Sequence, residues 1–209
     1  MIELYTYATP NGRKVSIALE ELALEYQLHI VNIQNKEQLS ESFLKLSPNN
    51  KIPAIVDTDT GISLMESGAI LLYLAEKTGQ LIPQDERRRW QCMEWLMWQM
   101  GGVGPMLGQV HHFSKFNSGV APYAEQRYFD EAQRLYRVLN KQLRSRAFIV
   151  GEYSLADIAV WPWISRFEWQ QIDLNNYPEV KRWYLNIAQR PAVIAGYDVP
   201  GLNEKIPLP

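Results

Sequence analysis

The spacing of the hydrophobic residues changes close to residue 80, and this change constrains the fold more than any other feature of the chain. In residues 1–80, β-rich segments alternate with amphipathic stretches, which is typical of a small mixed sheet covered by helices. Residues 79–83 then indicate a helix stop and a linker. Beyond them, apolar residues follow helical spacing, as at Trp90, Met93 and Met97. We therefore predict an α/β domain followed by an all-α domain.

The length of the chain fits this division. Its 209 residues allow one large domain or two small ones, with enough core for either. We place a first domain at residues 1–80, a linker at 81–86, a helical domain at 87–200 and a tail at 201–209.

The first domain is predicted to have the order βαβ–α–ββα. Its segments are separated by turn signals, such as the Pro-Asn-Gly that begins at Pro10. The expected strands lie at residues 2–7, 29–33, 54–57 and 62–65, and the expected helices follow Pro10 as far as residue 24 and span residues 40–46 and 67–78.

Charge and composition exclude several classes of partner. The formal net charge is -2, and acidic and basic residues are mixed along the chain, so we expect neither nucleic acid nor an anionic membrane as a partner. The longest apolar run, at residues 69–75, is too short to cross a bilayer. Cys92 has no second cysteine to pair with, and residues 1–5 lack the features of a signal peptide. We expect a cytoplasmic protein.

Ser154 to Asp157 has the pattern of a capping box at a helix start. In such a box, the Ser154 hydroxyl and the Asp157 carboxylate each accept a backbone N–H of the other residue. Tyr153 and Ile158 are placed for the accompanying hydrophobic staple. We interpret this motif as a folding signal.

Glu66 and Ser67 lie between a predicted strand and a predicted helix. A serine hydroxyl beside the N–H groups of a helix start can bind a carboxylate, and an adjacent glutamate can pair with an ammonium group. The pair suits one end of an amino-acid-like ligand. Alternatively, Ser67 is a plain N-cap and Glu66 a surface residue.

Pro53 comes directly before a predicted strand. A cis Ile52–Pro53 bond would turn the backbone groups of Ile52 outward, where an extended peptide could pair with them. The sequence does not decide between the cis and trans isomers.

Thr9 and Asn11 belong to the turn that follows the first strand. A hydroxyl and an amide on a loop that opens a helix can donate hydrogen bonds to a thiolate and so lower the pKa of a thiol. A turn with an N-cap is the alternative interpretation.

Three motifs together carry a family resemblance, which spans nearly the whole chain. They are Thr9-Pro10-Asn11-Gly12, Ser47-Pro48-Asn49-Asn50-Lys51-Ile52-Pro53-Ala54 and Glu66-Ser67-Gly68-Ala69-Ile70. They resemble the thioredoxin-like domain of cytosolic glutathione transferases. Within this family the chain is similar to the bacterial nu-class, whose members are associated with glutathione-dependent disulfide-bond reduction. This similarity rests on Thr9 with Asn11, the Pro-Asn-Asn-Lys-Ile-Pro run that begins at Pro48, and residues 104–108 with His111-His112.

The resemblance implies a role for each residue of the first domain's motifs. Glu66 and Ser67 would hold the γ-glutamyl end of glutathione, and Ile52 would pair through its backbone with the cysteinyl part, before a cis Pro53. Gln38 would contact the tripeptide.

The resemblance also implies how the sulfur is activated. Thr9 and Asn11 would donate hydrogen bonds to the glutathione sulfur, and Arg127 of the helical domain would reach toward glutathione across a homodimer. Glutathione would be a cosubstrate, present as two molecules or as one glutathione disulfide, and would supply the thiol chemistry itself.

Tyr7 leaves a second enzymatic function open. Other transferase classes use a tyrosine near this position to hold the thiolate, so Tyr7 favours conjugation of glutathione to small electrophiles. Since Tyr5 and Tyr7 share one face of the strand, core packing is the other interpretation. A third function is a non-catalytic scaffold with the same fold.

Two further groups of residues are interpreted as structural. Cys92 is expected to be a buried, inert thiol, and the chain has no Cys-x-x-Cys motif. His29, His111 and His112 lack metal-ligand spacing, so no metal is expected.

Overall fold

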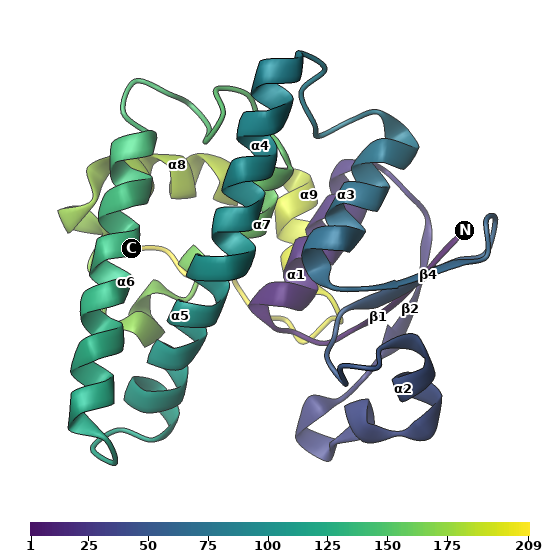
Figure 1. The fold of residues 1–209 in the computed structure, drawn as a ribbon, viewed down its shortest axis with the longest axis horizontal. Helices are drawn as coiled ribbons and strands as arrows, with labels where there is room; N and C mark the ends of the chain where they lie inside the picture. Colours follow the sequence, from purple (N-terminus) through teal and green to yellow (C-terminus); the bar gives the residue numbers. More distant parts are fainter. The chain divides into compact units, whose positions relative to one another are not determined.

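The structure is a computed structural model that describes residues 1–209. It divides into two compact units. The first contains Met1–Gln80 together with Gln189–Ile206, and the second contains Leu81–Ala188 together with Pro207–Pro209. The elements of each unit are labelled in Figure 1 and are described unit by unit.

A four-stranded mixed sheet forms the centre of the first unit. Its strands are β1 (Ile2–Thr6), β2 (Tyr26–Ile30), β3 (Ala54–Asp57) and β4 (Ile62–Met65), in the spatial order β2-β1-β3-β4. β1 pairs in parallel with β2 and antiparallel with β3, and β3 pairs antiparallel with β4. Alternate residues of β1 are buried, because successive side chains of a strand point to opposite faces. One face of this central strand therefore lies in the core.

Helices cover both faces of the sheet. α1 (Pro10–Glu21) and α3 (Ser67–Thr78) lie together on one face, and the short α2 (Glu41–Leu46) lies on the other (Figure 1). α9 (Pro191–Asp198) packs along α1. The predicted order of strands and helices in residues 1–80 is confirmed.

Two boundaries differ from the prediction. The second strand, predicted at residues 29–33, lies at Tyr26–Ile30, because the Asn32 side chain accepts hydrogen bonds from the next two backbone N–H groups of a 3-10 turn. Such local bonds compete with strand pairing. The first helix ends at Glu21 and not at residue 24, since Ala23 adopts a positive φ of 48°.

Buried polar contacts hold α9 and the segment after it to α1. Arg13 donates through Nε to the Tyr197 carbonyl at 2.9 Å, and its guanidinium carbon lies 3.6 Å from the centroid of the Tyr197 ring. Nη2 of Arg13 forms an ion pair with Glu204 at 2.7 Å. The hydroxyl of Ser16 donates to the Gly196 carbonyl at 2.6 Å. The C-terminal helix therefore completes the packing of α1.

These contacts place the C-terminal residues in a different unit from the one that the sequence-based division predicts. That division assigns residues 87–200 to the helical domain and 201–209 to a tail, whereas Gln189–Ile206 packs with the first unit. A helical period marks a helix in either unit, so it cannot tell which unit a helix joins.

The second unit is helical, as predicted. Its helices are α4 (Glu86–Trp98), α5 (Gly104–Val110), α6 (Pro122–Gln142), α7 (Leu155–Ile164) and α8 (Pro178–Ala188). π-helical segments precede and follow α5. Every residue of α7 is buried, so this helix forms the centre of the unit's core.

The predicted capping box at the start of α7 is confirmed. The Asp157 carboxylate accepts hydrogen bonds from the backbone N–H of Ser154 at 3.1 Å and from the Ser154 hydroxyl at 3.2 Å. It also accepts from the backbone N–H of Ile149 at 3.0 Å and from the indole N–H of Trp183 at 2.8 Å. One buried carboxylate thus ties three segments of the second unit together.

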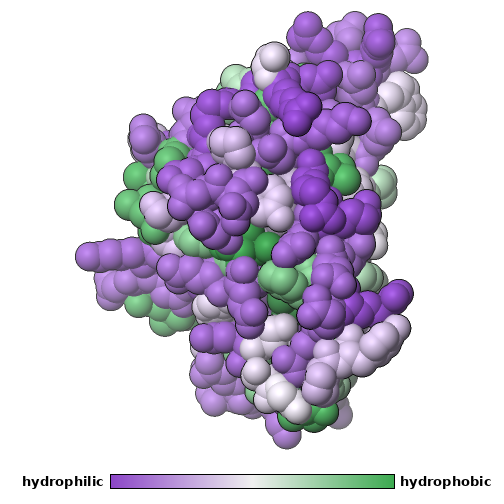
Figure 2. Space-filling view, turned by 90° about the vertical axis from the view of Figure 1, so that its left-hand side faces the viewer, coloured by the Kyte–Doolittle hydropathy of each residue, from purple (hydrophilic) through white to green (hydrophobic).

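None of the helices combines the length and the apolar character that crossing a bilayer requires. Figure 2 views the side on which α6 and α8 lie in Figure 1, and it shows mostly hydrophilic residues with small, separate hydrophobic areas. The apolar residues of these two amphipathic helices therefore face mainly inward.

Candidate functional site

Strand pairing brings the predicted site residues of the first unit to one end of the sheet. β1 and β2 are parallel, so both end there, followed by Thr9 after β1 and Gln38 after β2. β3 is antiparallel to β1 and begins at that end, directly after Ile52 and Pro53. β4 is antiparallel to β3 and ends there, just before Glu66. Four segments that are distant in sequence thus meet at one edge.

Thr9 is the N-cap of α1. Its hydroxyl oxygen accepts a hydrogen bond from the backbone N–H of Gly12 at 3.1 Å, and its extended backbone (φ −122°, ψ 161°) is typical of this position. The bond uses one lone pair of the hydroxyl and leaves its proton available to a ligand. Asn11 is half-buried in the first turn of the same helix.

Gly12 allows this turn to form. A Cβ atom at this position would overlap the carbonyl oxygen of Tyr7 and the side-chain oxygen of Thr6. Only glycine therefore lets α1 start so close to the end of β1.

Ile52 and Pro53 are joined by a cis peptide bond, so the isomer that the sequence leaves open is settled as cis. Pro53 is buried and Ile52 is half-buried. Neither the backbone N–H nor the carbonyl of Ile52 takes part in a hydrogen bond. Both groups are available to an extended peptide.

Glu66 and Ser67 do not form the plain serine cap that the sequence also allowed. Glu66 is the N-cap of α3, makes no side-chain cap bond and adopts a left-handed backbone (φ 70°, ψ 112°). Such a conformation costs a non-glycine residue about 1–3 kcal/mol and is concentrated at ligand sites. Ser67 is the first helical residue and is only 3% exposed. The strained residue thus leaves its carboxylate exposed beside a buried hydroxyl.

Lys14 is a polar residue of this region that the sequence did not single out. Its side chain is 1% exposed, and Nζ donates a hydrogen bond to the Ser67 hydroxyl oxygen at 3.1 Å. Burial lowers the pKa of Lys14 to about 7, although the charge of Glu66 opposes this shift. Lys14 could not be singled out from the sequence as part of this region, because its partner Ser67 is far away along the chain.

Gln38 lies in the 3-10 turn Glu37–Leu39 that leads toward α2. It is half-buried, and its side-chain oxygen has no hydrogen-bond partner. An unsatisfied buried acceptor is costly, so this amide is open to a donor from a ligand.

Comparison with known proteins agrees with this geometry. Residues 4–81 match the model of the glutathione S-transferase N-terminal domain, and residues 105–191 match that of the C-terminal domain. The disulfide-bond oxidoreductase YfcG of Escherichia coli (strain K12) is 52% identical over 198 residues, which cover 92% of each chain.

The chain belongs to the glutathione transferase family.

Two solved glutathione transferases have the same fold. One, from Pseudomonas putida, has one glutathione disulfide bound per subunit, a TM-score of 0.91 and 47% identity, and the match covers 96% of this chain and 92% of that one. The other, from Burkholderia graminis, has two glutathione molecules bound per subunit, a TM-score of 0.90 and 45% identity, and the match covers 96% and 89%. The predicted class, a thioredoxin-like domain followed by a helical domain, is confirmed.

Tyr7 of this glutathione transferase lies between β1 and the Thr9 turn. Its carbonyl accepts a hydrogen bond from the Thr9 N–H at 2.7 Å, and its hydroxyl makes none. Tyr5, by contrast, stacks on His29 with ring centroids 4.4 Å apart and donates to Glu3. Packing on the sheet thus accounts for Tyr5, whereas the hydroxyl of Tyr7 stays free to bind a ligand.

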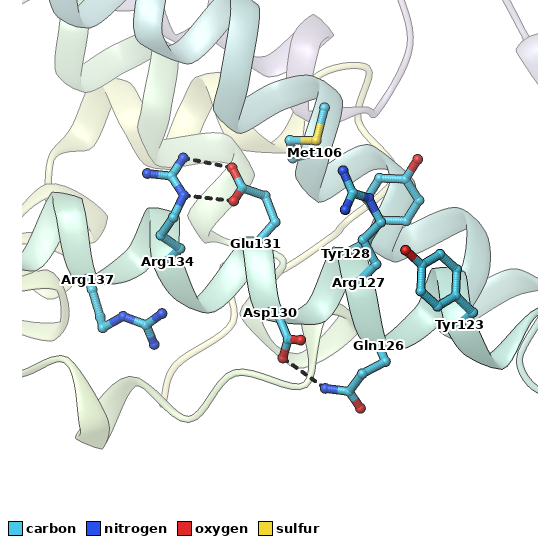
Figure 3. A pocket seen from close by; sticks show the side chains of 9 residues that line it. All are labelled: Met106, Tyr123, Gln126, Arg127, Tyr128, Asp130, Glu131, Arg134 and Arg137. Carbon is cyan, nitrogen blue, oxygen red and sulfur yellow. Dashed lines mark hydrogen bonds and ion pairs between the residues drawn. The ribbon is translucent and has the colours of Figure 1, made fainter.

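Arg127 belongs to the helical unit of this transferase. It lies on α6 in a surface groove and makes no hydrogen bond or ion pair there (Figure 3). Its neighbour Arg134 forms two 2.7 Å bonds with Glu131 and is thereby neutralised. Arg127 is therefore an exposed cation that no hydrogen bond holds in place, although its charge also acts on Glu131.

The residues interpreted as structural have structural environments. Cys92 is fully buried in α4, and burial raises the pKa of its thiol. His111 is buried, lies 3.1 Å from the side-chain nitrogen of Gln170 and stacks on Trp163. Burial lowers its pKa to about 4, so it is neutral at pH 7. No three His, Cys, Asp or Glu side chains gather where they could hold a metal ion.

Proposed function

We propose that this chain is a glutathione-dependent disulfide-bond reductase that uses bound glutathione as its thiol reagent. The observation that carries the proposal is the meeting of Thr9, Ile52 and Ser67 at one end of the sheet, where Thr9 and Ile52 each offer an unused polar group. A relative of 52% identity is named a disulfide-bond oxidoreductase, which supports the reaction class.

The polar groups at the two ends of the site match the γ-glutamyl part and the cysteinyl part of glutathione. Ser67 and the first N–H groups of α3 bind the γ-glutamyl carboxylate, and Glu66 pairs with the ammonium group. The open backbone of Ile52 pairs with the cysteinyl residue before cis-Pro53, and Gln38 donates to or accepts from the tripeptide.

Thr9 and Asn11 then meet the sulfur. Hydrogen bonds from the Thr9 hydroxyl and the Asn11 amide stabilise the thiolate and so lower the thiol pKa toward neutrality. The thiolate attacks a mixed disulfide of glutathione and a small thiol. A new S–S bond forms glutathione disulfide, the old S–S bond breaks, and the released thiolate takes up a proton from water. A site that holds two glutathione moieties, as in the transferases from Pseudomonas putida and Burkholderia graminis, fits this product.

The proposal includes a cytoplasmic homodimer. Trp90 and Met97 on α4 are 67% and 54% exposed, and this exposed apolar pair supports a subunit interface. In a dimer, the exposed Arg127 is available to glutathione on the other subunit.

The test is reduction of the mixed disulfide of glutathione and 2-mercaptoethanol, coupled to glutathione reductase and NADPH. We expect Thr9→Ala to lower kcat/KM about 10- to 100-fold, because a donor to the reacting anion is lost. Thr9→Ser keeps both the cap and the donor and should stay within a few-fold of the unaltered protein. Ser63→Ala, on the exposed strand β4, is the matched control. No activity in the unaltered protein would overturn the proposal.

Conjugation is the second candidate, favoured by the free hydroxyl of Tyr7 beside the Thr9 turn. Turnover of 1-chloro-2,4-dinitrobenzene that falls in Tyr7→Phe and not in Thr9→Ala would favour it. A non-catalytic scaffold would show neither activity, and glutathione disulfide at millimolar concentration would not raise its melting temperature.

A further inference from the structure

Ser47 is a buried serine in the turn between α2 and β3. It is 0% exposed, and its hydroxyl oxygen has three polar neighbours. It lies 2.8 Å from the carbonyl oxygen of Lys51, 3.4 Å from the backbone nitrogen of Lys51 and 3.8 Å from the sulfur of Met65. Lys51 comes directly before Ile52, and Met65 comes directly before Glu66. One buried hydroxyl therefore lies between two segments that lead into the candidate site.

The chemistry of these neighbours fixes what the Ser47 hydroxyl does. The backbone N–H of Lys51 can only donate, so the Ser47 oxygen accepts from it. The carbonyl of Lys51 can only accept, so the Ser47 proton is donated to it. The sulfur of Met65 is a weak acceptor at a longer distance and competes poorly for that proton. The hydroxyl thus binds both backbone groups of Lys51.

The backbone of Ser47 is fixed as well. Its N–H donates to the Phe43 carbonyl, and its carbonyl accepts from the N–H of Asn50, each at 2.8 Å. Asn50 has a positive φ of 49°, a conformation that asparagine tolerates in turns. Because a tight turn holds Ser47 at both of its backbone groups, its hydroxyl is a fixed support for Lys51.

A planar peptide bond carries this support to Ile52. The carbonyl of Lys51 and the N–H of Ile52 belong to one peptide unit, which is trans, so the two groups point in opposite directions. Since the Lys51 carbonyl points at the buried Ser47 hydroxyl, the Ile52 N–H points away from it. That N–H makes no hydrogen bond within the protein. A donor is thus held in one direction and left open to a ligand.

We propose that Ser47 is a positioning residue for glutathione: it orients the Lys51–Ile52 peptide so that the Ile52 N–H is ready to donate to the cysteinyl carbonyl. This inference rests on the proposed function, because it takes Ile52 as the residue whose backbone pairs with the cysteinyl part. Fixing the donor before the ligand arrives lowers the ordering cost of binding. Ser47 itself is assigned no contact with glutathione.

The test removes the hydroxyl and keeps the rest of the site. Ser47→Ala lacks the hydroxyl, Ser47→Thr keeps it, and Ser42→Ala, at an exposed serine of α2, is the matched control. Calorimetric titration with glutathione gives Kd for each protein. Backbone ¹⁵N relaxation of each ligand-free protein gives the order parameter of the Ile52 N–H, which reports whether the donor is already fixed.

We expect Ser47→Ala to bind glutathione about 3- to 10-fold more weakly, the effect of losing one neutral hydrogen bond. In disulfide reduction its KM for glutathione should rise, with kcat within a few-fold. Ser47→Thr and Ser42→Ala should bind glutathione like the unaltered protein.

The order parameter distinguishes positioning from a purely structural role. For the Ile52 N–H it should be about 0.85 in the unaltered protein, in Ser47→Thr and in Ser42→Ala, and below about 0.6 in Ser47→Ala. The order parameter of Leu4, in the core of the sheet, should be the same in all four proteins. A serine needed only for packing would lower the melting temperature when replaced and leave the Ile52 N–H rigid.

The outcomes separate this inference from the proposed function. If Ser47→Ala binds glutathione as tightly as the unaltered protein, or keeps a rigid Ile52 N–H, the role of Ser47 is overturned while disulfide reduction stands. If the unaltered protein binds glutathione without a shift of the Ile52 amide resonance, the inference is overturned, and the coupled assay reports separately on the reaction. Failure of the unaltered protein to bind glutathione overturns both.

The unaltered protein alone tests the inference if neither variant of Ser47 folds. Its Ile52 N–H should be rigid before glutathione is added, and its amide resonance should shift on addition. An order parameter below about 0.6 in the ligand-free protein would overturn the inference, because the donor would then not be positioned in advance.

Discussion

Gly196 of α9 lies against the backbone of Ile17 in α1. A Cβ atom at Gly196 would stand 2.6 Å from both the Cα and the N of Ile17, and backbone atoms cannot rotate away as a side chain can. We therefore expect Gly196→Ala to lower the free energy of unfolding by about 1–3 kcal/mol through overpacking. Thermal unfolding measures this, with Gly101→Ala as the control, because a Cβ there meets nothing within 4 Å. Equal melting temperatures would show that α9 does not dock on α1 this closely.

Asp57 makes the first unit sensitive to acid. Its burial alone would raise the carboxyl pKa, but hydrogen bonds from Lys77 and Tyr73 and from the Asp59 backbone outweigh it and hold the pKa at about 2. A depressed carboxyl pKa contributes stability above its unfolded value, about 3.9, and loses it as the pH falls through the folded value. We expect stability to decrease from about pH 5 to pH 2, as measured by urea unfolding.

The variant Asp57→Asn isolates this contribution. It should cost about 1–3 kcal/mol at pH 7, because the amide replaces a charged acceptor of buried bonds, and it should flatten the acid dependence. Asp59→Asn changes an exposed carboxylate of the same turn and should leave the acid dependence in place. An unchanged acid profile in Asp57→Asn would assign the loss of stability to other groups.

Asp157 should be among the most costly residues to truncate. Asp157→Ala leaves the Trp183 indole N–H and the backbone N–H groups of Ile149 and Ser154 buried without their acceptor. We expect a loss of about 3–5 kcal/mol, measured by tryptophan fluorescence in urea. Asp173→Ala, which removes an exposed cap of a 3-10 turn, should cost about 1 kcal/mol or less. Similar costs for the two would contradict the central role of Asp157.

Cys92 should be chemically inert in the native protein. The thiol is fully buried and its pKa is raised by burial, so little reactive thiolate is present. We expect 5,5′-dithiobis(2-nitrobenzoic acid) to label it only in denaturant, and Cys92→Ala to retain disulfide reduction within a few-fold. Activity lost in Cys92→Ala, with the fold intact, would make this thiol the nucleophile.

The sequence predicted those parts of the fold that local signals define. Pro10 after β1, the capping box at Ser154 and the change of period near residue 80 each depend on neighbours within a few residues, and each led to the correct element. β2 was misplaced because Asn32 ends the strand through a local bond that β propensity does not represent.

Long-range partners could not be predicted in this way. Lys14 meets Ser67, and Arg13 meets Tyr197, across separations of 53 and 184 residues. Lys14 and Arg13 are charged residues of an amphipathic helix, and the side chains of such residues are usually expected to be exposed to solvent. Local signals singled out the site residues Thr9, Ile52 and Ser67, the family resemblance gave them a common ligand, and the sheet register supplied the physical reason that they meet.

The docking of α9 on α1 has a consequence for the order in which the protein matures during its synthesis. Residues 189–206 leave the ribosome only after the whole of residues 81–188 has been made. Until then, Arg13 and Ser16 lack the carbonyl and carboxylate partners that the finished protein gives them. Domains generally fold as they emerge. Here the half of the protein that is translated first cannot complete its core until the end, so the helical unit can mature before it.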